Sequence, residues 1–271
     1  MCGEMLVDRV PIRALECHIV DHCNLRCEHC CSYSPLLKPW FADPRIVERD
    51  LRTARAVLAP EFLKIAGGEP LLHPELERLL AIAKESAAAP CVQLTTNGFL
   101  FERLTPHAWE CLDTLTVSLY PEPALPKPTI RAIARTAAAR NVPVNWKVQD
   151  RFQCLNRTTP ATPTEAREVF DRCWIRRRCN SIRDGRFYCC TRPQYVQKLA
   201  ADPRLFLEDS VELDAARIRE YLDRSEPLRT CHLCGGGDAP FAINRQMNPR
   251  TLRAWRTLLN SLTGRGSTAR C

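Results

Sequence analysis

The sequence lacks a long apolar run. None of its apolar stretches approaches the roughly 18 residues that a helix needs to cross a bilayer. Residues 1–8 also lack the order of basic and then apolar residues that is typical of a signal peptide. These absences predict a soluble, cytoplasmic protein that has no membrane partner.

Long blocks of one charge are missing too. The chain of 271 residues has 39 Lys and Arg and 31 Asp and Glu, which gives a formal charge of +8. The arginines are scattered, and residues 176–178 are the one tight basic run. This pattern favours a solvated or small-anion-binding surface over a nucleic-acid interface, so no nucleic-acid partner is expected.

Cysteine, in contrast, is abundant, with 16 residues in the chain. Small secreted domains use cysteine for disulfides, whereas intracellular proteins use it for metal binding or redox chemistry. A chain of this length does not need disulfides to be stable, and it shows no export signal. The cysteine content therefore indicates metal binding.

Strand-like and helix-like patterns alternate over residues 15–150. Strands are expected at residues 15–22, 62–66, 91–95, 114–119 and 142–148, and helices at 45–59, after Pro74, at 105–112 and at 129–140. Such alternation indicates parallel strands joined by helical crossovers. A complete eight-fold barrel needs about 250 residues. We therefore predict an α/β fold, a partial (β/α) TIM-like barrel with its site at the carboxyl ends of the strands.

The alternation ends near residue 151, and cysteine becomes dense again after it. Residues 158–164 are rich in Thr and Pro, which indicates a linker. We predict three regions: the partial barrel at residues 1–150, a small auxiliary module at 151–248, and a C-terminal helix and tail at 249–271.

A three-cysteine motif directly follows the first predicted strand. Cys23, Cys27 and Cys30 have the spacing C-x3-C-x2-C. Three thiolates can bind three irons of a cubane cluster and leave the fourth iron open for chemistry. Zinc is the alternative, although structural zinc normally takes four ligands. The fourth zinc ligand would come from one of three neighbours: His22, His29 or Cys31.

A second motif closes the next predicted strand. Its residues are Gly67, Gly68, Glu69 and Pro70. The glycines let the backbone approach a ligand closely, and a carboxylate or exposed carbonyls suit an ammonium group. Together with the three cysteines, this segment resembles the radical S-adenosylmethionine (SAM) superfamily. The resemblance implies that Cys23, Cys27 and Cys30 bind a [4Fe–4S] cluster and that residues 67–70 bind the amino group of SAM.

The resemblance also implies a reaction. An external one-electron reductant, such as flavodoxin or ferredoxin, reduces the cluster. SAM is then cleaved to methionine and a 5′-deoxyadenosyl radical, which abstracts a hydrogen atom from the substrate. His29, which precedes the third cysteine, and three residues at later strand ends are expected to contact SAM: Thr96, Asn97 and Ser118.

A second set of cysteines fits the auxiliary-cluster signature of the same superfamily. Cys173, Gly185 and Cys190 match its first part, and Cys231 and Cys234 follow as C-x2-C. We expect the short, one-cluster form called a twitch domain, with an auxiliary [4Fe–4S] cluster on these four cysteines. Two choices stay open, since Cys179 could replace Cys173, and Cys189 could replace Cys190. Zinc is again the alternative. Asp184 and Gly185 predict a hairpin turn.

A one-cluster module in so short a chain resembles the dehydrogenases and epimerases that act on sugars and aminocyclitols. In this hypothesis, Arg151 orients or deprotonates a substrate hydroxyl, and Cys154, Cys179 or Cys189 donates a hydrogen atom. A peptide maturase that modifies a ribosomal peptide is a second hypothesis, although few residues precede the first predicted strand. A non-catalytic electron-transfer protein is a third.

Overall fold

The computed structural model describes residues 9–200 and 202–262. Residues 1–8, on which the signal-peptide prediction depends, and the predicted tail at 263–271 lie outside this part. Five parallel strands come first, in chain order. They are β1 (Val10–Val20), β2 (Leu58–Gly67), β3 (Val92–Thr96), β4 (Thr114–Leu119) and β5 (Val144–Val148).

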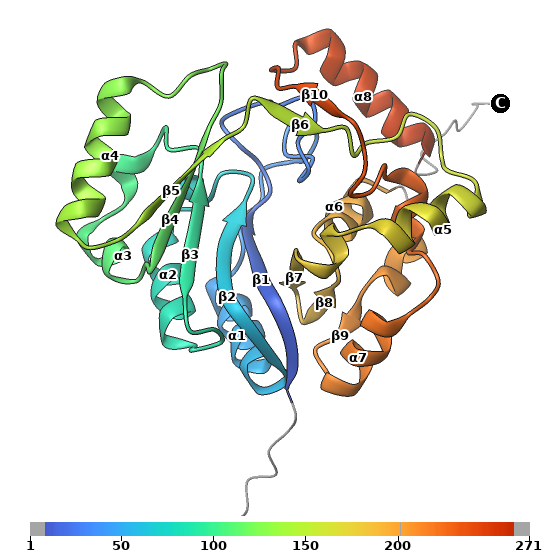
Figure 1. Cartoon of the computed structure of the whole chain (residues 1–271), viewed down its shortest axis with the longest axis horizontal. Coiled ribbons are helices and arrows are strands. Elements are labelled where there is room, and N and C mark those ends of the chain that lie inside the picture. Colours follow the sequence, from blue (N-terminus) through green and yellow to red (C-terminus); the bar gives the residue numbers. More distant parts are fainter. Residues whose placement is uncertain (1–8, 201, 263–271) are drawn as a thin grey trace, which may run out of the picture.

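Helices connect these strands along one face of the curved sheet (Figure 1). They are α1 (Pro44–Val57), α2 (Leu76–Glu85), α3 (Pro106–Glu110) and α4 (Lys127–Ala139). α1 begins at Asp43, whose side chain accepts a hydrogen bond from the backbone N of Arg45, and α3 begins at the similarly capping Thr105. The result is the predicted partial TIM-like barrel of parallel strands.

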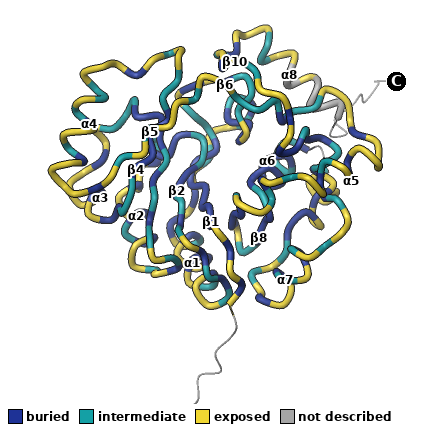
Figure 2. Tube along the Cα trace, viewed as in Figure 1, coloured by how far each residue is buried: buried dark blue, intermediate teal, exposed yellow. Residues whose placement is uncertain are grey.

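The core lies between the strands and these helices. Leu15 pairs with Leu63, and Leu94 pairs with Leu115, on neighbouring strands, and all four side chains are fully buried. Figure 2 shows buried residues along β1, β2 and β4 and exposed ones on the outer helices. This packing fixes the carboxyl ends of the strands at one edge of the sheet.

The largest errors in the predicted boundaries lie at the starts of two strands. β1 begins at Val10 rather than at residue 15, and β2 begins at Leu58 rather than at residue 62, directly after α1. The reason is tertiary pairing, because Val10 and Ile12 are buried and lie in register with Leu58 and Pro60 of the parallel neighbour. The helix predicted to reach residue 59 therefore ends at Val57.

Residues after 151 continue the same sheet. β7 (Asn180–Arg183) pairs in parallel with β1, and β8 (Arg186–Tyr188) and β9 (Val211–Glu212) follow antiparallel. The full order is β5-β4-β3-β2-β1-β7-β8-β9. The predicted hairpin turn is confirmed, since Asp184 and Gly185 both adopt positive φ between β7 and β8. The auxiliary region is thus hydrogen-bonded to the first strand of the barrel.

Further helices and strands complete the described part of the chain. The helices are α5 (Pro163–Arg172), α6 (Arg192–Leu199), α7 (Ala215–Asp223) and α8 (Pro249–Leu262), and β6 (Arg151–Gln153) pairs with β10 (Phe241–Ile243). Five 3-10 helices are η1 (Pro70–Leu72), η2 (Phe101–Arg103), η3 (Ile175–Arg177), η4 (Pro203–Asp209) and η5 (Arg229–Leu233). No helix among the described residues has the length and apolarity that a membrane crossing requires.

Candidate active site

The carboxyl ends of the strands surround a cavity of about 480 Å³, called here the strand-end cavity. It brings together residues that are far apart in the sequence. The residues predicted for the first cluster, SAM or the substrate that line it are Cys23, Cys27, His29, Cys30, Gly67, Gly68, Glu69, Thr96, Asn97, Ser118, Arg151 and Cys179. Three others do not line it: Pro70, Cys154 and Cys189, the last of which lines a separate small cavity. Pro70 is buried at the start of η1, and Cys154 lies beside His29 with its Sγ 3.8 Å from Nε2.

The three thiols of the first motif receive hydrogen bonds. The backbone N of Leu25 donates to Cys23 Sγ at 3.3 Å, and Gln246 Nε2 donates to Cys27 Sγ at 3.4 Å. Burial raises the pKa of all three thiols, that of Cys30 to about 12, and the neighbouring thiols raise them further. Such thiols ionise only where a strong cation compensates their charge, as metal coordination does.

The three thiols suit a multi-iron group. They line the cavity from separate positions in the loop. A cubane, in which each iron takes its own sulfur ligand, suits this spacing. In residues 9–200 and 202–262, no three His, Cys, Asp or Glu side chains form a group that could hold one metal ion.

A late segment of the chain covers this loop. The backbone N of Glu28 donates to the carbonyl of Arg245 at 2.9 Å, and that of Met247 donates to the carbonyl of Arg26 at 2.7 Å. Gln246 Oε1 accepts a further hydrogen bond from the backbone N of Arg26. Residues 245–247 thus form one wall of the three-cysteine loop.

Gly67 and Gly68 are required by the close approach of two backbone segments. A Cβ on Gly67 would lie 2.3 Å from the carbonyl O of Val20, and one on Gly68 would lie 2.0 Å from the carbonyl O of His22. The backbone N of Gly68 donates to Val20 O at 2.7 Å. These glycines therefore join the end of β2 to the segment that leads into the three-cysteine loop.

Glu69 connects two strand ends. Its Oε1 accepts hydrogen bonds from Leu71 N at 3.0 Å and Thr96 Oγ1 at 2.6 Å, and Oε2 accepts from Asn97 N at 2.8 Å. Burial raises the pKa of Glu69 to about 7, although these hydrogen bonds oppose the shift. The carboxyl thus positions the end of β3 as well as facing the cavity.

Asn97 extends this connection to the cysteine loop. Its Nδ2 donates to Asn24 Oδ1 at 2.7 Å and lies 3.6 Å from Cys23 Sγ. His29, in contrast, has a buried Nδ1 without a hydrogen-bond partner among the described residues. That imidazole nitrogen is therefore available for a hydrogen bond to a ligand in the cavity.

A buried polar network on the cavity wall was not predicted from the sequence. Lys64 Nζ donates to Glu16 Oε1 at 2.5 Å, and Glu16 Oε2 lies 2.9 Å from His18 Nε2. His18 Nδ1 also contacts the hydroxyl of Tyr195. Burial alone would raise the pKa of Glu16, but Lys64 and His18 hold it at about 2. The sequence contains a signal for this network, since Glu16 and His18 stand two apart in a mainly apolar strand and so point to the same face of the sheet.

The second cysteine set lines a separate small cavity, called here the thiol cavity. Its cysteines are Cys173, Cys189, Cys190, Cys231 and Cys234. Its other walls are mainly apolar and include Val169, Phe170 and Leu228. Cys179 lies elsewhere, because it lines the strand-end cavity. Ile175 and Arg192 line both cavities, so the two share a wall.

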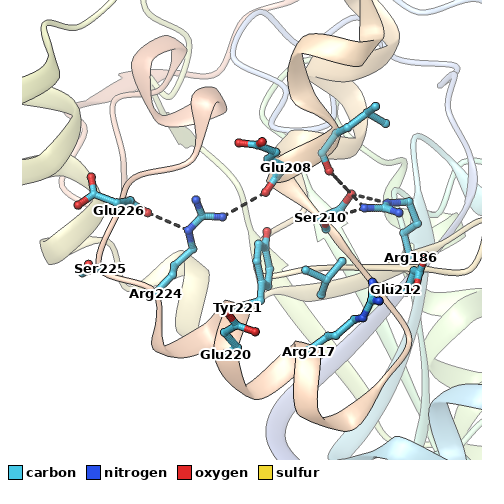
Figure 3. Close-up of a pocket in the computed structure, with 12 residues that line it drawn as sticks. Arg186, Glu208, Ser210, Glu212, Arg217, Glu220, Tyr221, Arg224, Ser225 and Glu226 are labelled. Atoms are coloured by element: carbon cyan, nitrogen blue, oxygen red, sulfur yellow. Dashed lines mark hydrogen bonds and ion pairs between the residues drawn. The ribbon is translucent and has the colours of Figure 1, made fainter.

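Another pocket, of about 870 Å³, lies away from both cysteine sets, against β8, β9 and α7 (Figure 3). Its arginines already have partners. Arg186 donates to Ser210 Oγ at 2.7 Å, Arg217 pairs with Glu212 at 3.0 Å, and Arg224 donates to two backbone carbonyls. It therefore offers neither thiols nor an unpaired cluster of one charge, and we place the chemistry in the strand-end cavity.

Comparison with known proteins agrees with this geometry. Residues 18–120, which include both motifs, match the Radical SAM superfamily. This part of the chain is therefore similar to radical SAM domains. Such a domain implies a [4Fe–4S] cluster and SAM.

Particular relatives extend this comparison. The chain is 34% identical over 123 residues to a GTP 3′,8-cyclase of Aquifex aeolicus, covering 43% of this chain and 38% of that one. It is 36% identical over 122 residues to a GTP 3′,8-cyclase of Mycobacterium marinum, covering 42% and 33%. The chain thus spans about a third of the length of these relatives.

One solved structure shares the fold over almost the whole chain. BtrN, crystallised in complex with AdoMet and 2-DOIA, superimposes with a TM-score of 0.50 at 14% identity, covering 94% of this chain and 90% of BtrN. The arrangement of the sheet is therefore common to both proteins.

Proposed function

We propose that this enzyme abstracts a hydrogen atom from a carbinol carbon of a small hydroxylated substrate, such as a sugar or aminocyclitol. Cys23, Cys27 and Cys30 would hold the SAM-binding [4Fe–4S] cluster. Residues 67–69, with His29 and the strand-end residues Thr96, Asn97 and Ser118, would surround SAM. An auxiliary [4Fe–4S] cluster would take its ligands from the thiol cavity: Cys173, Cys190, Cys231 and Cys234.

One observation carries this proposal. The strand-end cavity and the thiol cavity are separate but adjacent, and Ile175 and Arg192 line both. When bound, the two clusters supply one-electron chemistry, the first together with SAM as a source of a hydrogen-abstracting radical and the second as an electron carrier. A fold that holds AdoMet and 2-DOIA in BtrN is a precedent for a small polar substrate in such a cavity.

Cys179 favours epimerisation over dehydrogenation. Its thiol lines the strand-end cavity, and burial and the carboxylate of Glu16 raise its pKa to about 12. Cys179 is therefore a thiol at neutral pH and can donate a hydrogen atom. The C–H hydrogen leaves from one face of the substrate, and the Cys179 thiol returns one to the other. The resulting thiyl regains one electron from a ferredoxin- or flavodoxin-type reductant and one proton from solvent.

Other cavity residues suit the binding of a hydroxylated ring. Arg151, on β6, has an exposed guanidinium that lines the cavity, and Lys147 and Tyr120 line it from β5 and the segment after β4. The side chains of Arg151 and Lys147 have no hydrogen bond or ion pair to another described residue. Their donors are available to substrate oxygens, and in a dehydrogenase Arg151 would orient the hydroxyl that loses its proton.

The experiment uses anaerobically reconstituted protein with SAM, dithionite and a panel of sugars and aminocyclitols in D2O. We expect about eight irons per chain, 5′-deoxyadenosine, and a product of unchanged oxidation level that carries one solvent deuterium. Cys179→Ala should still form 5′-deoxyadenosine but should not form the epimer, whereas Cys91→Ala, a cysteine outside both cavities, should behave like the wild type. Absence of 5′-deoxyadenosine with every substrate would reject the proposal.

A purine nucleotide is the second candidate substrate. The curated relatives are GTP 3′,8-cyclases that match this chain at 34–36% identity, and the unpaired cations Lys147 and Arg151 could meet phosphate oxygens. GTP therefore belongs in the substrate panel. SAM cleavage that depends on GTP, with no response to sugars or aminocyclitols, would favour this candidate.

A further inference from the structure

Arg192 is a buried cation at the wall between the two cavities. It opens α6, is 2% exposed and lines both the strand-end cavity and the thiol cavity. A charged group taken out of water at this depth is costly unless an opposite charge compensates it. The question is therefore what carries the compensating charge.

The partners of Arg192 are neutral oxygens. Its Nη2 donates to Asn156 Oδ1 at 2.8 Å and contacts the hydroxyl of Tyr33, and the carbonyl oxygens of Leu155 and Cys31 lie at 3.5 Å. The guanidinium also lies 4.6 Å from the centre of the Tyr33 ring. Within residues 9–200 and 202–262, Arg192 forms no ion pair with a carboxylate, so these contacts orient the cation without neutralising it.

Two features of Arg192 point to the thiol cavity. Its buried Nε has no hydrogen-bond partner among the described residues, which leaves a charged donor unused. Arg192 also lines the same small cavity as the thiols Cys190 and Cys234. Those thiols belong to the thiol cavity, so the negative charge that Arg192 requires would be located there.

We propose that Arg192 is the counter-charge of the auxiliary iron–sulfur cluster and that it raises the reduction potential of that cluster. This inference rests on the auxiliary-cluster part of the proposed function. A cubane held by four thiolates is anionic and gains one more negative charge on reduction. A fixed cation nearby stabilises the reduced form more than the oxidised form. Arg192 is then a positioning residue whose charge favours electron uptake beside the strand-end cavity.

The test measures a potential. Full-length protein with Cys23, Cys27 and Cys30 all changed to Ala keeps only the second cysteine set, and its cluster is titrated with dithionite and followed by EPR. In that background, Arg192→Met should lower the equilibrium constant for reduction of the cluster by about tenfold or more. This corresponds to a decrease of about 59 mV in the reduction potential for one electron. Arg192→Lys keeps the charge, so its reduction potential should lie closer to that of the background with intact Arg192.

Asn156→Ala is the matched control, because it removes the 2.8 Å hydrogen-bond partner of Arg192 and leaves the cation in place. A purely structural role predicts equal potentials for Arg192→Met, Asn156→Ala and the background, and that result would overturn the proposal. If Arg192→Met and Arg192→Gln fail to bind iron while Arg192→Lys binds it, the counter-charge role is supported. If none of these three variants binds iron, the proposal is overturned.

The two levels of the hypothesis can be told apart. If the background with intact Arg192 binds no iron, the auxiliary cluster itself is rejected, and the Arg192 proposal falls with it. If iron binds and the potential does not respond to the charge at position 192, only the Arg192 proposal fails.

Discussion

The strand-end cavity and the thiol cavity both contain cysteines, but their other walls differ. Around Cys23, Cys27 and Cys30 stand polar groups such as Glu69, Asn97 and Lys64. The walls around the second set are mainly apolar, with Val169, Phe170 and Leu228 among them, and the two cations that line this cavity are Arg176 and Arg192. The first cavity measures about 480 Å³, which is in the range of small-molecule sites.

The difference does not follow the number of thiols, because five cysteines among the described residues line each cavity. Many polar neighbours offer groups that can bind a polar ligand. Mainly apolar walls suit a group that is fully ligated by protein. The number of cysteines alone therefore does not distinguish the two cavities, whereas the polarity of their walls does.

The largest expected effect comes from adding one methyl group to a glycine beside one cavity and comparing it with the same change beside the other. In Gly68→Ala the new Cβ would lie 2.0 Å from His22 O, so the backbone that leads into the three-cysteine loop must move. We expect at least a hundredfold loss of 5′-deoxyadenosine formation and about half the iron content. Gly236→Ala is the matched variant, because it has φ of +72° and its Cβ would meet Val169 at 2.7 Å.

Gly236→Ala should instead lower the iron of the second set and keep SAM cleavage. The measurements are iron content and 5′-deoxyadenosine yield for both variants. If the two variants lose the same activities, the cavities are not independent, and the comparison fails.

A smaller effect concerns the charged network on the wall of the strand-end cavity. Glu16→Gln leaves Lys64 without its partner, which should lower the free energy of unfolding by about 3 kcal/mol at pH 7. The folded pKa of Glu16 is about 2, below its usual value of 4.5. Its contribution is therefore present above about pH 4.5 and disappears as the pH falls towards 2.

Urea unfolding of wild type and Glu16→Gln at pH 7 and pH 3 measures this difference. The difference in the free energy of unfolding between the two proteins should be smaller at pH 3 than at pH 7. Glu48→Gln, which removes an exposed i,i+4 ion pair with Arg52, should change stability by less than about 1 kcal/mol at both pH values. If the difference between wild type and Glu16→Gln is the same at both pH values, the pH-dependent stabilisation does not come from Glu16.

The smallest expected effect lies at Cys27. Gln246→Ala removes the amide that donates to Cys27 Sγ and accepts from Arg26 N, a loss of about 1 kcal/mol for each bond. We expect the equilibrium constant for reduction of the first cluster to fall a few-fold, while that of the second cluster stays unchanged. An EPR titration measures both. An equal change in both clusters would show that residue 246 acts on the whole fold.

Sequence reasoning predicted the strand ends well because parallel strands bring their carboxyl ends to one edge. Gly67, Asn97 and Ser118 meet there as expected. It could not choose between Cys173 and Cys179, because that choice depends on the parallel pairing of β7 with β1, which no local pattern encodes. It missed the Glu16–Lys64 pair because residues that are 48 positions apart become neighbours only through strand register.

The wall formed by residues 245–247 has a consequence for biosynthesis. Cys27 and Gln246 are 219 positions apart in the sequence. The loop therefore acquires its hydrogen bonds to residues 245–247 only when that later segment has been synthesised and has folded against it.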